Sequence, residues 1–155
     1  MTKAPAKTKV TKRATGPTPC ERNRILLVDD EKTIRDLFQR ILALRLPTCR
    51  IDVAVNGAEA VEQFHEAHHA VIMMDLRMPV MDGHAAFLEI QKLCRAENIE
   101  MPSVIFCTGY EPPDIIKKLT EKNSSHCILH KPVSDILLFE AFNARMGLNA
   151  GPQKA

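Results

Sequence analysis

VIMMDLRMPVMDG, residues 71 to 83, carries the clearest structural pattern in this sequence. Four apolar residues run up to Asp75, and Pro79 and Gly83 follow in the loop. A short apolar run closed by turn residues is typical of a strand buried on both faces of a sheet. The stretch therefore predicts a buried strand that delivers one carboxylate to a loop.

Four further short runs extend this pattern along the chain. They are ILLV at 25–28, IDVAV at 51–55, VIFC at 104–107 and CIL at 127–129. Only 51–55 alternates between apolar and polar residues, which suits a strand at the edge of a sheet. With residues 71–74, the sequence predicts five strands.

Apolar residues at helical spacing fill the segments that follow these strands. Such segments begin near residues 34, 60, 87, 115 and 135, and Ser134 is the predicted N-cap of the last. Strict alternation of strands and helices predicts a doubly wound α/β domain, in which helices cover both faces of a parallel sheet. Ligands of such domains bind at the carboxyl ends of the strands.

The composition divides the chain into a basic tail and a body. At 155 residues, 45% of them hydrophobic, the chain can bury one domain. Residues 1–22 carry six Lys or Arg against Glu21, a charge of +5, which leaves −3 for the rest of a total of +2. We expect a disordered tail at 1–22, a folded domain at 23–147 and a short C-terminal tail at 148–155.

Other sequence features limit the class of protein. No apolar run approaches the roughly 20 residues that cross a bilayer, and the N-terminus lacks a secretory apolar core. Five dispersed cysteines, none spaced as CxxC, indicate reduced thiols. We expect a cytoplasmic protein without a membrane partner. The tail reads as a solvated extension, with contact to nucleic acid or lipid headgroups as the alternative.

Chemically useful side chains follow the predicted strands. They are Asp29 and Asp30 after 25–28, Asp75 after 71–74, Thr108 after 104–107, and Lys131 after 127–129. Carboxylates brought together repel unless a cation lies among them, and hard oxygen ligands in an open crevice suit Mg²⁺. With a lysine and a hydroxyl added, the strand ends predict a site for a phosphoryl group.

These residues resemble the motifs of response regulator receiver domains from two-component systems. The matching stretches are VDDE at 28–31, DLRMPVMDG at 75–83, Thr108, and HKPV at 130–133. The resemblance covers residues 23–147. It implies a flavodoxin-like (βα)₅ fold with strand order 2-1-3-4-5, in a stand-alone signalling domain similar to chemotaxis regulators, not an enzyme.

The resemblance also implies a role for each site residue. Asp75 is the expected phosphoacceptor, and Asp29, Asp30, Asp75 and the main-chain carbonyl of Arg77 are the expected Mg²⁺ ligands. The expected phosphoryl-binding groups are Lys131, Thr108, Gly109 and the backbone of Arg77.

Two further pairs of positions concern switching and lifetime. Thr108 and Ile128 occupy the family's switch positions, but the second is usually aromatic, and the stiff side chain of Ile128 predicts a smaller switching range. Arg77 and Tyr110 flank the expected phosphoryl group. Their bulk predicts slow hydrolysis of the phosphoaspartate.

The expected function is to accept a phosphoryl group on Asp75 from a histidine kinase or phosphotransfer protein. The last helix has apolar residues at 136–139, 141, 142, 146 and 148, more than one stripe needs. With strand 127–129 and the helix before it, this predicts a surface for an output partner or a homodimer. The alternatives are a pseudo-receiver that binds partners without phosphorylation and, ranked last, an aspartyl-phosphate hydrolase, which would need DxD on the first strand.

Overall fold

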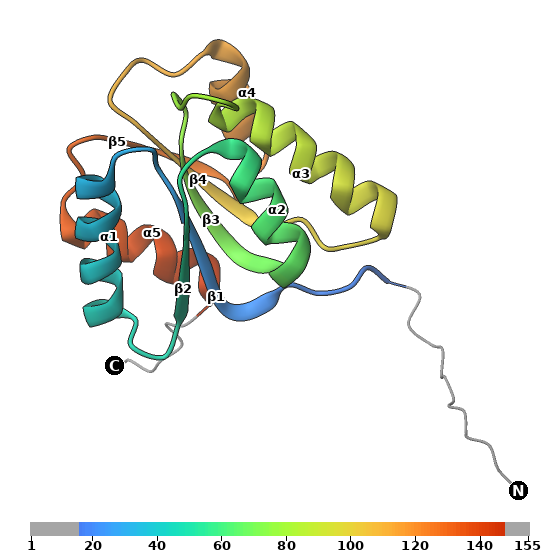
Figure 1. Cartoon of the computed structure of the whole chain (residues 1–155), viewed down its shortest axis with the longest axis horizontal. Coiled ribbons are helices and arrows are strands. Elements are labelled where there is room, and N and C mark those ends of the chain that lie inside the picture. Colours follow the sequence, from blue (N-terminus) through green and yellow to red (C-terminus); the bar gives the residue numbers. More distant parts are fainter. Residues whose placement is uncertain (1–15, 148–155) are drawn as a thin grey trace, which may run out of the picture.

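The computed structural model describes residues 16–147. Its five strands form one parallel sheet in the order β2-β1-β3-β4-β5 (Figure 1). The strands are β1 (Glu21–Val28), β2 (Arg50–Ala54), β3 (His69–Asp75), β4 (Ser103–Thr108) and β5 (Cys127–His130). The helices are α1 (Lys32–Arg45), α2 (Gly57–Ala67), α3 (Gly83–Glu97), α4 (Asp114–Lys122) and α5 (Asp135–Met146). The predicted fold, its strand order and the edge position of β2 are confirmed.

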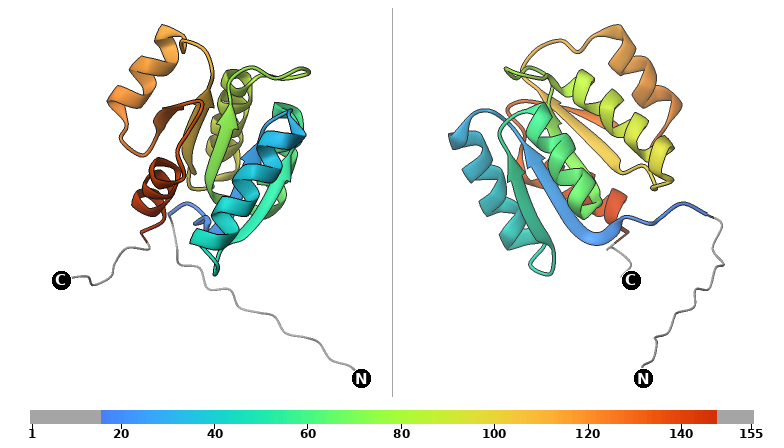
Figure 2. Two further views of the ribbon diagram at one scale, coloured as in Figure 1. Left: turned by 90° about the vertical axis from the view of Figure 1, so that its left-hand side faces the viewer. Right: turned by 45° about the vertical axis from the view of Figure 1, so that its right-hand side comes forward.

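Helices cover both faces of the sheet (Figures 1 and 2). Residues of α1 and α5 form one buried cluster with the sheet, and residues of α2, α3 and α4 form the other. Alternate residues of β1 point to opposite faces of the sheet. Ile25 and Leu27 belong to the cluster with α1 and α5, and Leu26 and Val28 belong to the cluster with α2, α3 and α4. Burial on both faces explains why this strand reads as a continuous apolar run.

Capping residues fix where three of the helices begin. The side chains of Asn56, Asp82 and Ser134 each accept a hydrogen bond from a main-chain N–H three residues later. The predicted cap at Ser134 is confirmed, and such a cap stabilises a helix by roughly 1 kcal/mol. The cap at Asp82 matters for the site because it sets the start of α3 directly after the loop that leaves β3.

The folded part begins before residue 23, so the predicted tail boundary is too late for the described part of the tail. Thr18 forms a parallel bridge with Ile99, its N–H donates to the carbonyl of Asn98 at 2.7 Å, and β1 begins at Glu21. Main-chain hydrogen bonds hold this segment whatever its side chains, which composition cannot reveal. The expectations for residues 1–15 and 148–155 lie outside the described residues.

Helix α5 leaves part of its apolar surface uncovered. Leu138 and Phe142 are fully buried, whereas Ile136 is 58% and Leu137 53% exposed. The prediction that some apolar residues of this helix remain uncovered is therefore confirmed.

All five cysteines are free thiols, as expected. Near the end of α2, His65 pairs with Glu97, and His69, the first residue of β3, pairs with Asp52. Within residues 16–147, no helix is long and apolar enough to cross a membrane.

Candidate functional site

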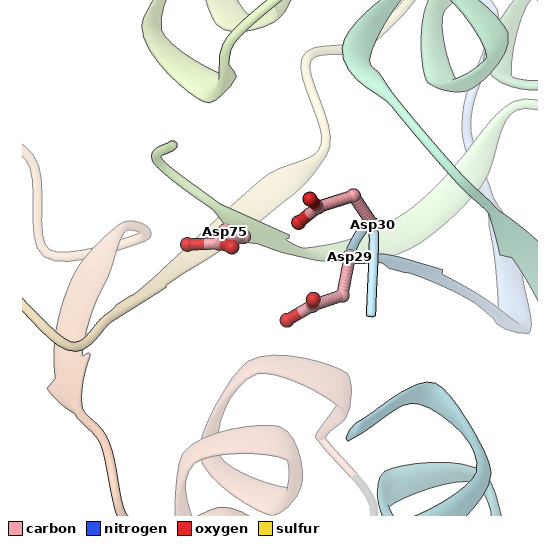
Figure 3. Close-up of side chains that lie close together, drawn as sticks. All are labelled: Asp29, Asp30 and Asp75. Carbon is pink, nitrogen blue, oxygen red and sulfur yellow. The ribbon is translucent and has the colours of Figure 1, made fainter. Parts of the chain in front are cut away.

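Three carboxylates converge at the carboxyl end of the sheet. Asp29 and Asp30 follow β1, Asp75 ends β3, and these two strands are neighbours (Figure 3). One carboxylate oxygen from each residue lies within 4.8 Å of those of the other two. Asp29 and Asp75 are buried, whereas Asp30 is exposed and opens the cluster to solvent.

Lys131 reaches this cluster from the loop after β5. Its Nζ atom lies 2.8 Å from Oδ2 of Asp29 and 3.5 Å from Oδ2 of Asp75. The main-chain N–H of Lys131 donates to the carbonyl of Thr108 at 2.8 Å, which holds the loop against the end of β4. The lysine predicted for the site is thus placed between two of its acids.

The electrostatics of the cluster follow from burial and charge. Burial raises the pKa of Asp75, and the neighbouring charge of Asp29 raises it further, while Lys131 opposes the rise. Burial alone would lower the pKa of Lys131, but its hydrogen bond to Asp29 and the charges of both acids raise it. The lysine is therefore held in its charged form, and the charge on Asp75 is disfavoured.

Two contacts that sequence reasoning missed hold Asp29 in place. The main-chain N–H of Glu31 donates to Oδ1 of Asp29 at 2.9 Å, and Nη1 of Arg35 donates to the Asp29 carbonyl at 2.8 Å. Arg35 lies one turn into α1, and nothing in its spacing from the acidic pair singles it out in the sequence.

The hydroxyl of Thr108 is engaged with its own loop. It accepts from the N–H of Tyr110 at 3.1 Å and donates to the carbonyl of Tyr110 at 3.3 Å. Thr108 is buried at the end of β4. The predicted switch residue therefore bonds to the loop that leads into α4.

Arg77 and Tyr110 stack on each other at the rim of the pocket. The guanidinium carbon of Arg77 lies 4.0 Å from the centre of the Tyr110 ring. Both residues line the open pocket together with Asp75, Gly109 and Lys131. The main-chain N–H of Arg77 donates to Oδ1 of Asp75 at 3.4 Å; the role of its carbonyl as a metal ligand stays a prediction.

Ile128 lies away from these groups in the middle of β5. It pairs with Phe106 of β4 and packs, half-buried, against the cluster formed with α2, α3 and α4. Because Ile128 packs against apolar residues, we expect it to affect the site only through changes in side-chain packing.

The donor set fits a divalent cation. Three carboxylates and one lysine leave two uncompensated negative charges, and all the side-chain oxygens on offer are hard ligands. Within residues 16–147 this is the single group of three potential metal-binding side chains. Mg²⁺ matches both the charge and the ligand type.

The model of the response regulator receiver domain family matches residues 25–143 of this sequence. The chain belongs to the receiver domain family. The chemotaxis protein CheY of Halobacterium salinarum is 33% identical over 122 residues, which cover 74% of this chain and 96% of that protein. This receiver domain is also 41% identical over 81 residues, 52% of its length, to a protein-glutamate methylesterase/protein-glutamine glutaminase of Aliivibrio fischeri, of which it spans 22%.

Solved structures share the fold of this receiver domain. A receiver domain protein from Clostridium thermocellum is similar with a TM-score of 0.64 and 25% identity, covering 80% of this chain and 94% of that one. Chemotaxis protein CheY4 of Vibrio cholerae gives a TM-score of 0.63 at 22% identity, covering 79% and 97%, and supports the fold alone.

Proposed function

We propose that this receiver domain accepts a phosphoryl group on Asp75 from the phosphohistidine of a histidine kinase or phosphotransfer protein. The observation that carries the proposal is the convergence of Asp29, Asp30 and Lys131 on Asp75 in a chain of this family. Action in the cytoplasm, where kinases draw on ATP, belongs to the same proposal. We also propose that the domain has no catalytic activity beyond its own phosphorylation and dephosphorylation.

In the proposed reaction, a carboxylate oxygen of Asp75 attacks the phosphorus atom of the donor. The new P–O bond forms as the P–N bond to the donor's imidazole breaks, so the phosphoryl group moves without net hydrolysis. Burial of Asp75 at the end of a rigid strand fixes the attacking oxygen. Lys131, already 3.5 Å from that carboxylate, can pair with a phosphoryl oxygen.

Asp29, Asp30 and Asp75 would hold Mg²⁺, with the carbonyl of Arg77 as the further proposed ligand. When bound, the cation neutralises the negative charge that gathers on the transferred group. The chain's own contribution is to position the acids, and the contacts of Asp29 with Glu31 and Arg35 serve this purpose.

The output is proposed to be a surface change on the side of α4, β5 and α5. Thr108 is bonded to the loop that leads into α4, so recruiting its hydroxyl to a phosphoryl oxygen would break two contacts in that loop. Ile115, Ile136 and Leu137 are exposed on these helices and could contact a partner or a second copy. Ile128 lies in β5, between these two helices in the sequence, and is half-buried. Because its side chain is apolar, we expect it to move only when the packing around it changes.

The test is to incubate the purified protein with acetyl phosphate and Mg²⁺, and separately with beryllofluoride. Mass spectrometry should show one labile phosphoryl adduct, which Asp75→Asn abolishes and Asp114→Asn, at an exposed acid outside the cluster, leaves intact. Absence of both the adduct and a beryllofluoride response in a folded sample would favour the pseudo-receiver. A larger solution size on phosphorylation would assign dimerisation as the output.

A further inference from the structure

The loop from β3 to α3 carries four consecutive apolar residues, Met78, Pro79, Val80 and Met81. Loops are ordinarily polar, and an exposed apolar run in one calls for a functional reason. Met78 and Met81 are half-buried and pack against the core, whereas Pro79 is exposed and Val80 is 82% exposed. The loop thus packs Met78 and Met81 against the core and exposes Pro79 and Val80 to solvent.

Val80 sits at the apex of a tight turn in an unfavourable conformation. Its φ angle is +73°, and across it the N–H of Met81 donates to the carbonyl of Pro79 at 2.8 Å. This is a three-residue γ-turn of the strained kind, which requires positive φ at its centre. A β-branched residue is poorly suited to that region, where glycine or asparagine is the usual choice.

Contacts on both sides prevent the turn from relaxing. The N–H of Gly57, at the start of α2, donates to the carbonyl of Met81 at 2.9 Å, and the N–H of Gly83 donates to the carbonyl of Leu76 at 3.1 Å. A side chain at Gly57 would lie 2.5 Å from that same Met81 oxygen. The valine is therefore held in place by its surroundings, and such retained strain points to a function.

The turn belongs to the loop that leaves the phosphoacceptor, at the end of the sheet that a donor must approach. The loop leaves Asp75 directly and projects at the carboxyl end of the sheet (Figure 2). Arg77 lines the pocket that holds Asp75, and it also lines a second pocket together with Met78 and Pro79 of the loop. A macromolecule that brings a phosphohistidine to Asp75 covers this loop, whereas a small phosphodonor does not.

We propose that Val80 is a preformed apolar contact for the protein that donates the phosphoryl group, seated in an apolar recess beside the donor's phosphohistidine. The proposal rests on the proposed function of Asp75. A turn fixed before binding presents the side chain without loss of conformational freedom on association. Glycine would suit the turn better but would remove the contact.

The experiment uses the full chain with Val80→Gly and Val80→Asn, both of which suit positive φ, the second keeping side-chain bulk but not apolarity. Leu44→Asn is the matched control, because Leu44 is 80% exposed and lies near the end of α1, at the opposite end of the sheet. Each variant is phosphorylated by acetyl phosphate and by the autophosphorylated histidine kinases of the source organism, with kcat and KM measured for the kinase that best phosphorylates the unaltered chain.

We expect both Val80 variants to raise KM for the kinase at least fivefold, with kcat and the acetyl phosphate rate within twofold of the unaltered chain. The urea midpoint of Val80→Gly should be higher, and Leu44→Asn should leave both donors unaffected. The Val80 proposal would be overturned if the KM for the kinase did not change, or if the rate with acetyl phosphate fell as much as the rate with the kinase. It would also be overturned if acetyl phosphate phosphorylated the unaltered chain but none of the kinases did. Failure of acetyl phosphate and beryllofluoride alike on the unaltered chain would instead remove the proposed function itself.

Discussion

Asp75 lowers the stability of the fold and carries the proposed chemistry. Asp75 is 8% exposed, and its carboxylate lies near Asp29 and shares Lys131 with it. Burial and the neighbouring acid raise the pKa of Asp75, so the folded protein binds this proton more readily than the unfolded chain does. At neutral pH without a cation, the charge on Asp75 therefore lowers the stability of the fold.

Replacing Asp75 with Asn should accordingly stabilise the cation-free protein at pH 7.5 by roughly 1 kcal/mol. Lys131 keeps its 2.8 Å contact with Asp29, so the substitution leaves neither of these two charges unpaired. Urea unfolding in EDTA measures the difference. In saturating Mg²⁺ the gap should close, because only the unaltered site binds the cation strongly. A lower midpoint in EDTA would contradict this account.

The stacked side chains of Arg77 and Tyr110 should slow hydrolysis of the phosphoaspartate. With the guanidinium carbon 4.0 Å from the ring centre, the pair covers part of the pocket through which a water would approach. Tyr110→Ala should shorten the phosphoaspartate half-life by roughly three- to tenfold, whereas Tyr110→Phe, which keeps the cation–π contact, should change it little. Loss of labelled phosphate from the purified protein gives the rate. A half-life of seconds in the unaltered protein would refute the idea.

At the scale of elements, we expect the loop from β4 to α4 to respond to phosphorylation. Thr108 bonds both polar backbone groups of Tyr110, so the start of the loop depends on one hydroxyl. If that hydroxyl turns to a phosphoryl oxygen, the N–H of Tyr110 loses its acceptor.

Beryllofluoride with Mg²⁺ should therefore speed amide hydrogen exchange at Tyr110, observed by NMR. Amides in the central strand β3, where residues 71–75 are buried, should keep their protection and serve as the internal reference. The Asp75→Asn variant should show no change. If exchange at Tyr110 is unaltered or slower in protein that has bound beryllofluoride, Thr108 does not act as the switch residue.

At the scale of the whole molecule, buried histidines make stability depend on pH. His126 is 4% exposed, its Nδ1 atom accepts from the N–H of Val104 at 3.0 Å, and burial lowers its pKa to about 4. The unfolded chain then binds the proton more readily than the fold does. Stability from this group is complete above an unfolded pKa of roughly 6.5 and is lost as the pH falls toward 4.

Between pH 7.5 and pH 4.5, the unaltered protein should lose about 2 kcal/mol more stability than His126→Asn. Asparagine does not titrate, and its carbonyl oxygen can replace Nδ1 as the acceptor for Val104. Urea titrations at the two pH values give the comparison. Burial also lowers the pKa of His69, against the opposing effect of Asp52, and His69 is unchanged in the variant, so its contribution cancels. Equal losses in both proteins would rule out His126 as the source.

Much of the fold and of the site was predictable because both depend on local pattern. The apolar runs that became β1 and β3 are buried on two faces, and the acids that follow them come to the same edge because the strands are parallel neighbours. Lys131 was predictable in the same way from its place after β5. Arg35 was not, because an arginine on a helix has many partners within reach and only the docked position of α1 selects the carbonyl of Asp29.

By itself, the sequence determined the order of elements, the two-faced burial of the central strands and the set of charged groups at their ends. These follow from hydrophobic periodicity and from turn and capping residues, which act over a few positions. Only the tertiary structure decided that Thr18 joins the fold, that the Thr108 hydroxyl bonds to Tyr110, and that Val80 is held at positive φ. Those outcomes depend on which distant groups packing brings within hydrogen-bonding distance, and composition and spacing along the chain do not specify that.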